Sequence, residues 1–203
     1  MPEICLATED SLSEDVGIRL ISELGRDFHV GQKFRQNGFG FLKKRILSFC
    51  EIAQRSAFLL ITDLDTGLCP STLKLSWVNP NHCPNRLLFR VAVREIESWL
   101  LADHEGMKKL LDKGASRLPD NPDQLTDPKK FLINSAQRAP RQIRDDLVPE
   151  RGSNAIQGFG YNQRLGLFVR EMWSPERAAL RSDSLRRAIG RLQELKDLID
   201  LEP

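Results

Sequence analysis

Short apolar runs alternate with stretches of helical periodicity in the first half of the chain, and this alternation constrains the fold most strongly. The runs lie at residues 3–7, 57–62 and 87–93, and they are almost unbroken, as expected of strands covered on both faces. Between them, apolar residues recur at helical spacing over residues 11–24 and 39–53. The sequence therefore predicts an α/β fold with a mostly parallel sheet flanked by helices.

The length and composition limit the number of domains. With 203 residues and 40% hydrophobic residues, the chain can close one sizeable core with a small addition. We expect an α/β core over residues 1–112. Residues 113–203 are expected to form a loop-rich, helical C-terminal extension packed on that core, polar and Pro-rich at first and helical again from Tyr161.

Charge, cysteine usage and hydropathy exclude several classes of protein. The formal net charge of +2 is too small to indicate a nucleic-acid partner by itself. The four cysteines form no CxxC pair, which favours a reduced, cytoplasmic protein. No run reaches the roughly 18 to 20 apolar residues of a membrane span, and neither a GxxxxGK[ST] loop nor a GxGxxG fingerprint is present.

Two aspartates follow the second apolar run, in the sequence "AFLLITDLDTG". In a strand, Asp63 and Asp65 point to the same side, with Cα atoms about 6.6 Å apart. Both carboxylates can then face one hard cation such as Mg²⁺, at the strand ends where open α/β sheets bind ligands. The alternative is a turn in which the aspartates cap backbone amides and Gly67 takes a positive φ.

Other acids occupy comparable positions. Glu9 ends the first apolar run, so a parallel sheet can bring it beside Asp63 and Asp65. Glu14 is either a metal ligand or the partner of Ser11 in a capping box. Glu97 follows the third apolar run on a locally apolar face, where it is either functional or a solvated or ion-paired side chain.

The segments "ATEDSLSED", "LLITDLDTG" and "VREIESWLLAD", in this order and spacing, resemble the Toprim family. That family includes domains of topoisomerases and primases and the nuclease domains of overcoming-lysogenization-defect proteins. The chain is most similar to small stand-alone bacterial Toprim-like proteins, over roughly residues 3–112. The resemblance implies a compact fold of about four strands, with Mg²⁺ or Mn²⁺ held by Glu9, Asp63 and Asp65.

The sequence also departs from the family pattern. Asp10 occupies the place of the glycine that usually follows the first-strand glutamate. The third acid that usually comes close behind the DxD pair is missing, which leaves Glu97 or Glu14 as its substitute. We therefore assign Glu9, Asp63, Asp65 and Glu97 as candidate catalytic residues, with Glu14 as a further candidate ligand.

Metal-dependent hydrolysis of phosphodiester bonds is the chemistry that such acids favour. A topoisomerase-like reaction needs a tyrosine nucleophile, and the only tyrosine, Tyr161, is remote in sequence and is expected to be a packed, structural residue. Two basic stretches can contact phosphates or can simply be solvated faces. Their residues are Lys33, Arg35, Lys43, Lys44 and Arg45, and Lys129, Lys130, Arg138, Arg141 and Arg144.

The sequence thus predicts a Mg²⁺- or Mn²⁺-dependent nuclease that acts on nucleic acid, with DNA favoured over RNA. By resemblance, such proteins work beside an ATPase partner in defence against phage. The alternative is a non-catalytic interaction module whose acidic site is vestigial or binds a structural metal. A divalent-metal titration separates the two hypotheses.

Overall fold

The computed structural model describes residues 2–35, 39–67, 69–79 and 82–201, and its contacts divide the chain into two compact units. The first unit contains residues 1–93 and 187–203, and the second contains residues 94–186. This division falls earlier than the boundary expected at residue 112, because α4 (Ile96–Leu101) and α5 (His104–Leu111) pack against α9 (Pro175–Ala179) of the second unit.

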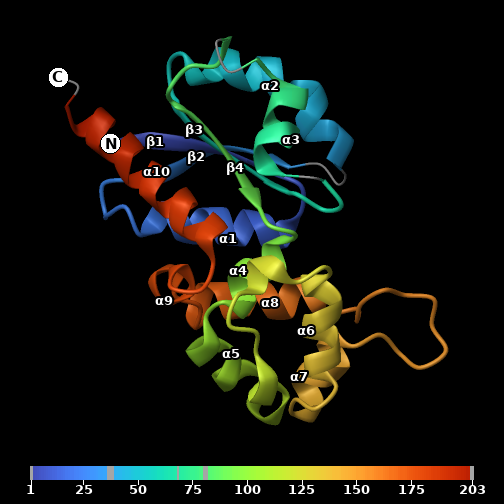
Figure 1. Ribbon diagram of the computed structural model, residues 1–203. Coiled ribbons are helices and arrows are strands. Elements are labelled where there is room, and N and C mark those ends of the chain that lie inside the picture. The colour runs from blue at the N-terminus through green and yellow to red at the C-terminus, as the bar shows by residue number, and fades with distance from the viewer. Residues whose placement is uncertain (1, 36–38, 68, 80–81, 202–203) are drawn as a thin grey trace. The chain divides into compact units, whose positions relative to one another are not determined.

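The first unit is an α/β fold built on a four-stranded sheet in the order β2-β1-β3-β4, in which all neighbouring strands are parallel. The strands are β1 (Glu3–Thr8), β2 (His29–Arg35), β3 (Ala57–Asp63) and β4 (Leu87–Ala92). The predicted fold class is confirmed, and the architecture is consistent with a Toprim-like fold. Figure 1 shows the sheet with helices on both of its faces.

Helices cover the two faces of the sheet with different sets of side chains. On one face, α1 (Ser11–Ser22) lies so close that a Cβ added at Gly17 would approach Leu6 and Ile61. On the other face, α2 (Phe39–Ala53) and α3 (Pro70–Trp77) contribute to a cluster of buried apolar side chains with strands β1, β3 and β4. Burial on both faces explains why three of the strands are continuous apolar runs.

Strand β2 is the element that the sequence analysis did not predict. It pairs with β1 at the edge of the sheet, and its residues, HVGQKFR, are largely exposed. A half-covered edge strand lacks the apolar run that identified the other three strands. Its position follows from the pairing with β1 rather than from its own composition.

The second unit is helical. Its further elements are η2 (Asp112–Arg117), η3 (Pro122–Gln124), α6 (Pro128–Ala136), α7 (Arg141–Leu147) and α8 (Tyr161–Glu171). Trp99 and Trp173 are fully buried in it, and the indole Nε1 of Trp173 donates a hydrogen bond to the Trp99 carbonyl at 3.1 Å. The buried Asp103 accepts hydrogen bonds from Arg177 Nε at 2.7 Å and from the Ser174 amide at 2.9 Å.

The last helix, α10 (Asp183–Asp200), starts in the second unit and continues into the first. Within the first unit, Lys196 Nζ of this helix donates a hydrogen bond to the carbonyl of Leu24 at 2.9 Å. The predicted helical periodicity of residues 183–199 is confirmed. In the described part of the chain, no helix combines the length and the apolar character needed to cross a membrane.

Candidate functional site

The acidic edge of the first unit, defined as Glu9, Asp63 and Asp65, lies where the strand order reverses. From β1 the chain moves to β2 on one side of the sheet and then returns to β3 on the other side. The carboxyl ends of β1 and β3 therefore flank a topological switch point, which is where open α/β sheets bind ligands. Glu9 follows β1 directly, and Asp63 is the last residue of β3.

Glu9 is tied to the end of the neighbouring strand through one carboxylate oxygen. Its Oε1 accepts a hydrogen bond from the hydroxyl of the buried Thr62 and another from the backbone amide of Asp63 at 3.2 Å. These contacts bring together Glu9 and Asp63, which are 54 residues apart in the chain. The parallel arrangement predicted from the sequence thus places Glu9 against the Asp63 backbone.

Asp65 has a backbone conformation that non-glycine residues rarely adopt. Its φ is 49°, in the left-handed region, and its side chain is exposed. Gly67 does not share this conformation, but a Cβ at this position would lie 2.8 Å from the Leu64 carbonyl oxygen. The alternative of a turn in the sequence analysis predicts a positive φ at Gly67. The structure places it at Asp65 instead. Because β3 ends at Asp63 and Asp65 lies in the turn that follows, the predicted strand geometry, in which Asp63 and Asp65 point to the same side of one strand, is wrong.

The negative charges at this edge repel one another. Burial raises the pKa of the Glu9 carboxyl, and the charges of Asp65 and Asp10 raise it further. The hydrogen bonds from Thr62 and from the Asp63 amide act in the opposite direction by favouring the carboxylate. A cation bound here would relieve the repulsion between Glu9 and Asp65.

The donor chemistry of the acidic edge fits a hard divalent ion, because Mg²⁺ and Mn²⁺ prefer carboxylate oxygens. The hydrogen bonds to Glu9 both end on Oε1 rather than Oε2. Among the residues that the structure describes, no three Asp, Glu, His or Cys side chains are grouped closely enough to hold a metal ion. The edge therefore supplies suitable ligand types at converging strand ends, without an assembled three-ligand cage.

Glu14 has other partners. Asp10, not Ser11, caps α1, with its Oδ1 accepting from the Ser13 amide at 2.8 Å, so the expected capping box is wrong. The Glu14 carboxylate instead contacts Lys33 Nζ at 3.0 Å and Arg35 Nε at 3.1 Å, both on β2. Lys33 and Arg35, two residues of the first basic stretch, are therefore paired with an acid of the same unit. The role of Glu14 as a metal ligand stays a prediction.

Glu97 belongs to the second unit, where it is 2% exposed. Its Oε1 accepts a hydrogen bond from the Tyr161 hydroxyl at 2.9 Å and lies 3.5 Å from Lys129 Nζ. Burial raises the pKa of this carboxyl to about 6, although the charge of Lys129 opposes the rise. Tyr161 itself is fully buried, which confirms that it is a packed residue, and the catalytic role of Glu97 stays a prediction.

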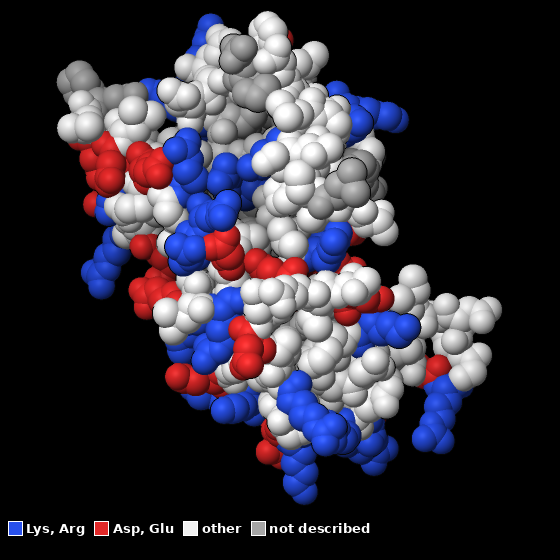
Figure 2. Space-filling view, in the orientation of Figure 1, with Lys and Arg blue, Asp and Glu red and all other residues white. Residues whose placement is uncertain are grey.

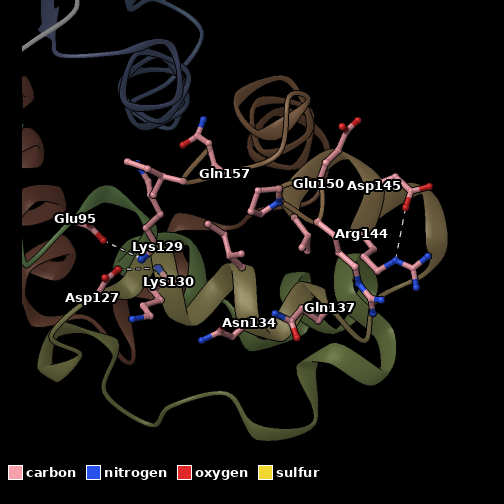
Figure 3. A pocket seen from close by; sticks show the side chains of 15 residues that line it. Glu95, Asp127, Lys129, Lys130, Asn134, Gln137, Arg144, Asp145, Glu150 and Gln157 are labelled. Atoms are coloured by element: carbon pink, nitrogen blue, oxygen red, sulfur yellow. Dashed lines mark hydrogen bonds and ion pairs between the residues drawn. The ribbon is translucent and has the colours of Figure 1, made fainter. Parts of the chain in front are cut away.

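A groove in the second unit contains part of the second basic stretch. Side chains of α6 and α7 line one side, and the loop after α7 lines the other (Figure 3). Its charges are mixed, because acids such as Glu95 and Asp145 line it beside the lysines and arginines, and Arg144 Nε lies 3.6 Å from Asp145 Oδ1. The groove is therefore a weaker candidate for binding an anion than its lysines and arginines suggest.

Sequence reasoning missed three cations of the first unit whose charges act on one another: Arg90 of β4 and Arg191 of α10 both contribute to the lowered pKa of Lys74 of α3. The three residues are far apart in sequence, so no local pattern groups them. One signal was available: Arg90 interrupts the apolar strand LLFRVA. An arginine within an otherwise apolar strand indicates that its side chain either pairs with an anion or reaches solvent at the edge of the sheet.

No family model matches this chain, and no curated protein or solved structure is significantly similar to it.

Proposed function

We propose that the first unit is a Mg²⁺- or Mn²⁺-dependent enzyme that cleaves phosphodiester bonds in nucleic acid, with DNA favoured over RNA. One observation carries the proposal: the Glu9 carboxylate meets the Asp63 backbone at the switch point between β1 and β3, where the charge of Asp65 also acts on Glu9. The resemblance of the motifs around these residues to Toprim domains supports it.

In the proposed mechanism, Glu9, Asp63 and Asp65 hold the divalent ion. The ion, when bound, supplies activation of the attacking water and stabilisation of the entering and leaving oxygens. Thr62 and the Asp63 amide orient the Glu9 carboxylate by donating to Oε1. The left-handed turn at Asp65 displaces this carboxylate from the strand path and exposes it at the edge.

The proposed setting follows from the same resemblance. An ATPase partner would couple cleavage to phage defence, and the cytoplasm is the proposed location. All four cysteines are free thiols, two of them buried, which agrees with a reducing compartment.

A nuclease assay of the full chain with labelled DNA and RNA, alone and with a candidate ATPase, tests the proposal. We expect cleavage with Mn²⁺ or Mg²⁺ that excess EDTA stops. Glu9→Gln, Asp63→Asn and Asp65→Asn should each abolish cleavage. When several residues hold one metal ion together, substituting any one of them removes nearly all of the activity. The matched control is Asp27→Asn, at an exposed position of the same unit, which should cleave normally.

Cleavage that persists in EDTA, or in the Asp63 and Asp65 variants, would place the chemistry elsewhere. The second candidate is a non-catalytic interaction module, which the engagement of Glu9 Oε1 by Thr62 and Asp63 favours. Calorimetric titration with Mn²⁺, read together with the cleavage assay, separates the candidates. A module with a vestigial site binds no metal, and a module with a structural metal binds it without cleaving nucleic acid. The enzyme binds the metal and cleaves, and it loses both properties in all three acidic variants.

A further inference from the structure

The groove of the second unit lies between α6 and α7 on one side and the loop of residues 148–160 on the other, and its volume is about 1380 Å³. Sites for small molecules usually measure roughly 300 to 1,000 Å³, so this groove has room for a longer ligand. The base of the loop is fixed, because the Gly158 amide donates a hydrogen bond to the Leu147 carbonyl at 3.0 Å. A Cβ at Gly158 would overlap the carbonyl oxygen of Asp146. One wall of the groove is therefore held in place by the chain itself.

Three amide side chains line this groove. Asn134 and Gln137 are three residues apart on α6 and therefore share a face of the helix, and Gln157 belongs to the loop (Figure 3). In the described part of the chain, none of these three side chains forms a hydrogen bond. A primary amide carries both donors and an acceptor, so it can pair with either polar group of a peptide backbone.

The charges of the lining leave two cations available to a ligand. Neither Lys130 nor Arg151 forms an ion pair with any residue that the structure describes. Most of the lining acids are already engaged: Glu95 Oε2 and Asp127 Oδ1 each accept a hydrogen bond from a backbone amide of α6, at 2.8 and 2.7 Å. Asp145 pairs with two arginines of α7. The groove can therefore pair with an acidic side chain of a ligand.

Apolar side chains complete the lining. Ile133 of α6 is buried and Val148 is half-buried, whereas Ile156 of the loop is 82% exposed. Phe159, three residues further along the loop, is fully exposed. Figure 2 shows that this loop projects from the unit with a largely uncharged surface. Large apolar side chains exposed on one loop beside a groove are typical of a surface that contacts another protein.

A protein ligand fits these features better than a nucleic acid does. Sites for single strands combine a positively charged groove with aromatic side chains that stack on the bases. Among the residues that the structure describes, the groove lining contains no aromatic side chain. The lining acids, including Glu150, would also repel a phosphate backbone.

We propose that this groove binds an extended segment of a partner protein that carries both acidic and apolar side chains. The amide side chains bond to the peptide backbone, Lys130 and Arg151 pair with an acidic side chain, and Ile156 packs against an apolar one. The inference goes beyond the proposed hydrolysis and does not depend on it, because its residues all belong to the second unit.

Selection from a library of short random peptides displayed on phage, with the full chain as the target, tests the proposal. We expect the enriched peptides to combine acidic and apolar residues. Such a peptide, resynthesised with a fluorescent label, should bind the full chain in an anisotropy titration. Lys130→Met and Arg151→Met should each weaken this binding roughly tenfold, because each removes a contact to a charged group. The matched control, Lys108→Met at an exposed position on α5, should bind the peptide normally.

Two further measurements guard against misfolding and against a different ligand. The substituted side chains are exposed, so the variants should melt at the wild-type temperature. A labelled single-stranded oligonucleotide, titrated in EDTA, is the competing ligand. The proposal is overturned if the selection enriches no acidic peptide, if the peptide binds all variants equally, or if the oligonucleotide binds in place of the peptide in a manner that depends on Lys130 and Arg151.

Discussion

The backbone amide of Asp63 donates a hydrogen bond to Glu9 Oε1 at 3.2 Å, joining the carboxyl ends of β3 and β1. This contact connects two motifs that lie 54 residues apart in the sequence. It also opposes the rise in the pKa of Glu9 that burial causes, because hydrogen bonds to a carboxylate favour the charged form. This contact thus fixes the Glu9 carboxylate against the end of β3.

Asp63→Asn should weaken divalent-metal binding while leaving the fold intact or more stable. The asparagine keeps the backbone amide that donates to Glu9 and removes one negative charge from the edge. Calorimetric titration with Mn²⁺ and thermal melts measure the two effects. Unfolding of the variant would indicate that the aspartate is a structural cap.

Substitutions of Asp65 should rank by their tolerance of a positive φ. Because Asp65 has a φ of 49°, Asp65→Gly and Asp65→Asn should retain stability, whereas Asp65→Ala should cost about 1 kcal/mol. Chemical denaturation measures this order. All three variants should lose metal binding equally, which separates the strain at this residue from its role as a ligand.

Glu97 should make stability dependent on pH. Its pKa is raised to about 6 from the ordinary value of 4.5, so the folded state binds the proton more tightly than the unfolded state. The resulting stabilisation is fully present below pH 4.5 and is lost as the pH rises through about 6. It amounts to roughly 2 kcal/mol.

Glu97→Gln should remove this slope, because glutamine does not titrate and still accepts from the Tyr161 hydroxyl. Urea denaturation between pH 4 and 7 measures the difference between variant and wild type. A wild-type carbon-13 NMR titration of the Glu97 carboxyl that gives an ordinary value would contradict the prediction.

Tyr161→Phe should leave any nuclease activity intact, because hydrolysis uses activated water rather than a tyrosine nucleophile. The same variant should raise the pKa of Glu97 further. The hydrogen bond from the Tyr161 hydroxyl favours the charged carboxylate, and phenylalanine cannot donate it. A nuclease assay and an NMR titration give the two readouts. Loss of activity with an unchanged fold would point to a transesterification by Tyr161.

Trp99→Ala should destabilise the second unit by about 3 to 5 kcal/mol, because a large buried side chain leaves a cavity. Trp99 is fully buried, and its Nε1 donates to Ser184 Oγ at 2.7 Å. Trp99→Phe, which fills most of the volume, is the matched control. A shift in melting temperature as small as that of an exposed substitution would show that Trp99 faces solvent.

Local periodicity predicted three strands of the sheet and several of the helices. The apolar runs at β1, β3 and β4 and the helical stripes of α1, α2, α8 and α10 are confirmed, because burial on both faces or on one stripe leaves a pattern within a few residues. Strand β2 has no such apolar pattern in its sequence, because it is an exposed edge strand. The N-cap of α1 was also missed by one position, because Ser11 and Asp10 are both good caps.

The sequence by itself determined the α/β class and the placing of Glu9, Asp63 and Asp65 at strand ends, because both follow from the local order of apolar and polar residues. Only the tertiary structure decided that Glu9 contacts the Asp63 amide, that Glu14 pairs with β2 and that Glu97 is buried with Tyr161. It also decided that the charge of Arg191 contributes to the lowered pKa of both Lys74 and Arg90. Such contacts depend on which strands become neighbours, and the order β2-β1-β3-β4 is set by the packing of the whole unit rather than by any one segment.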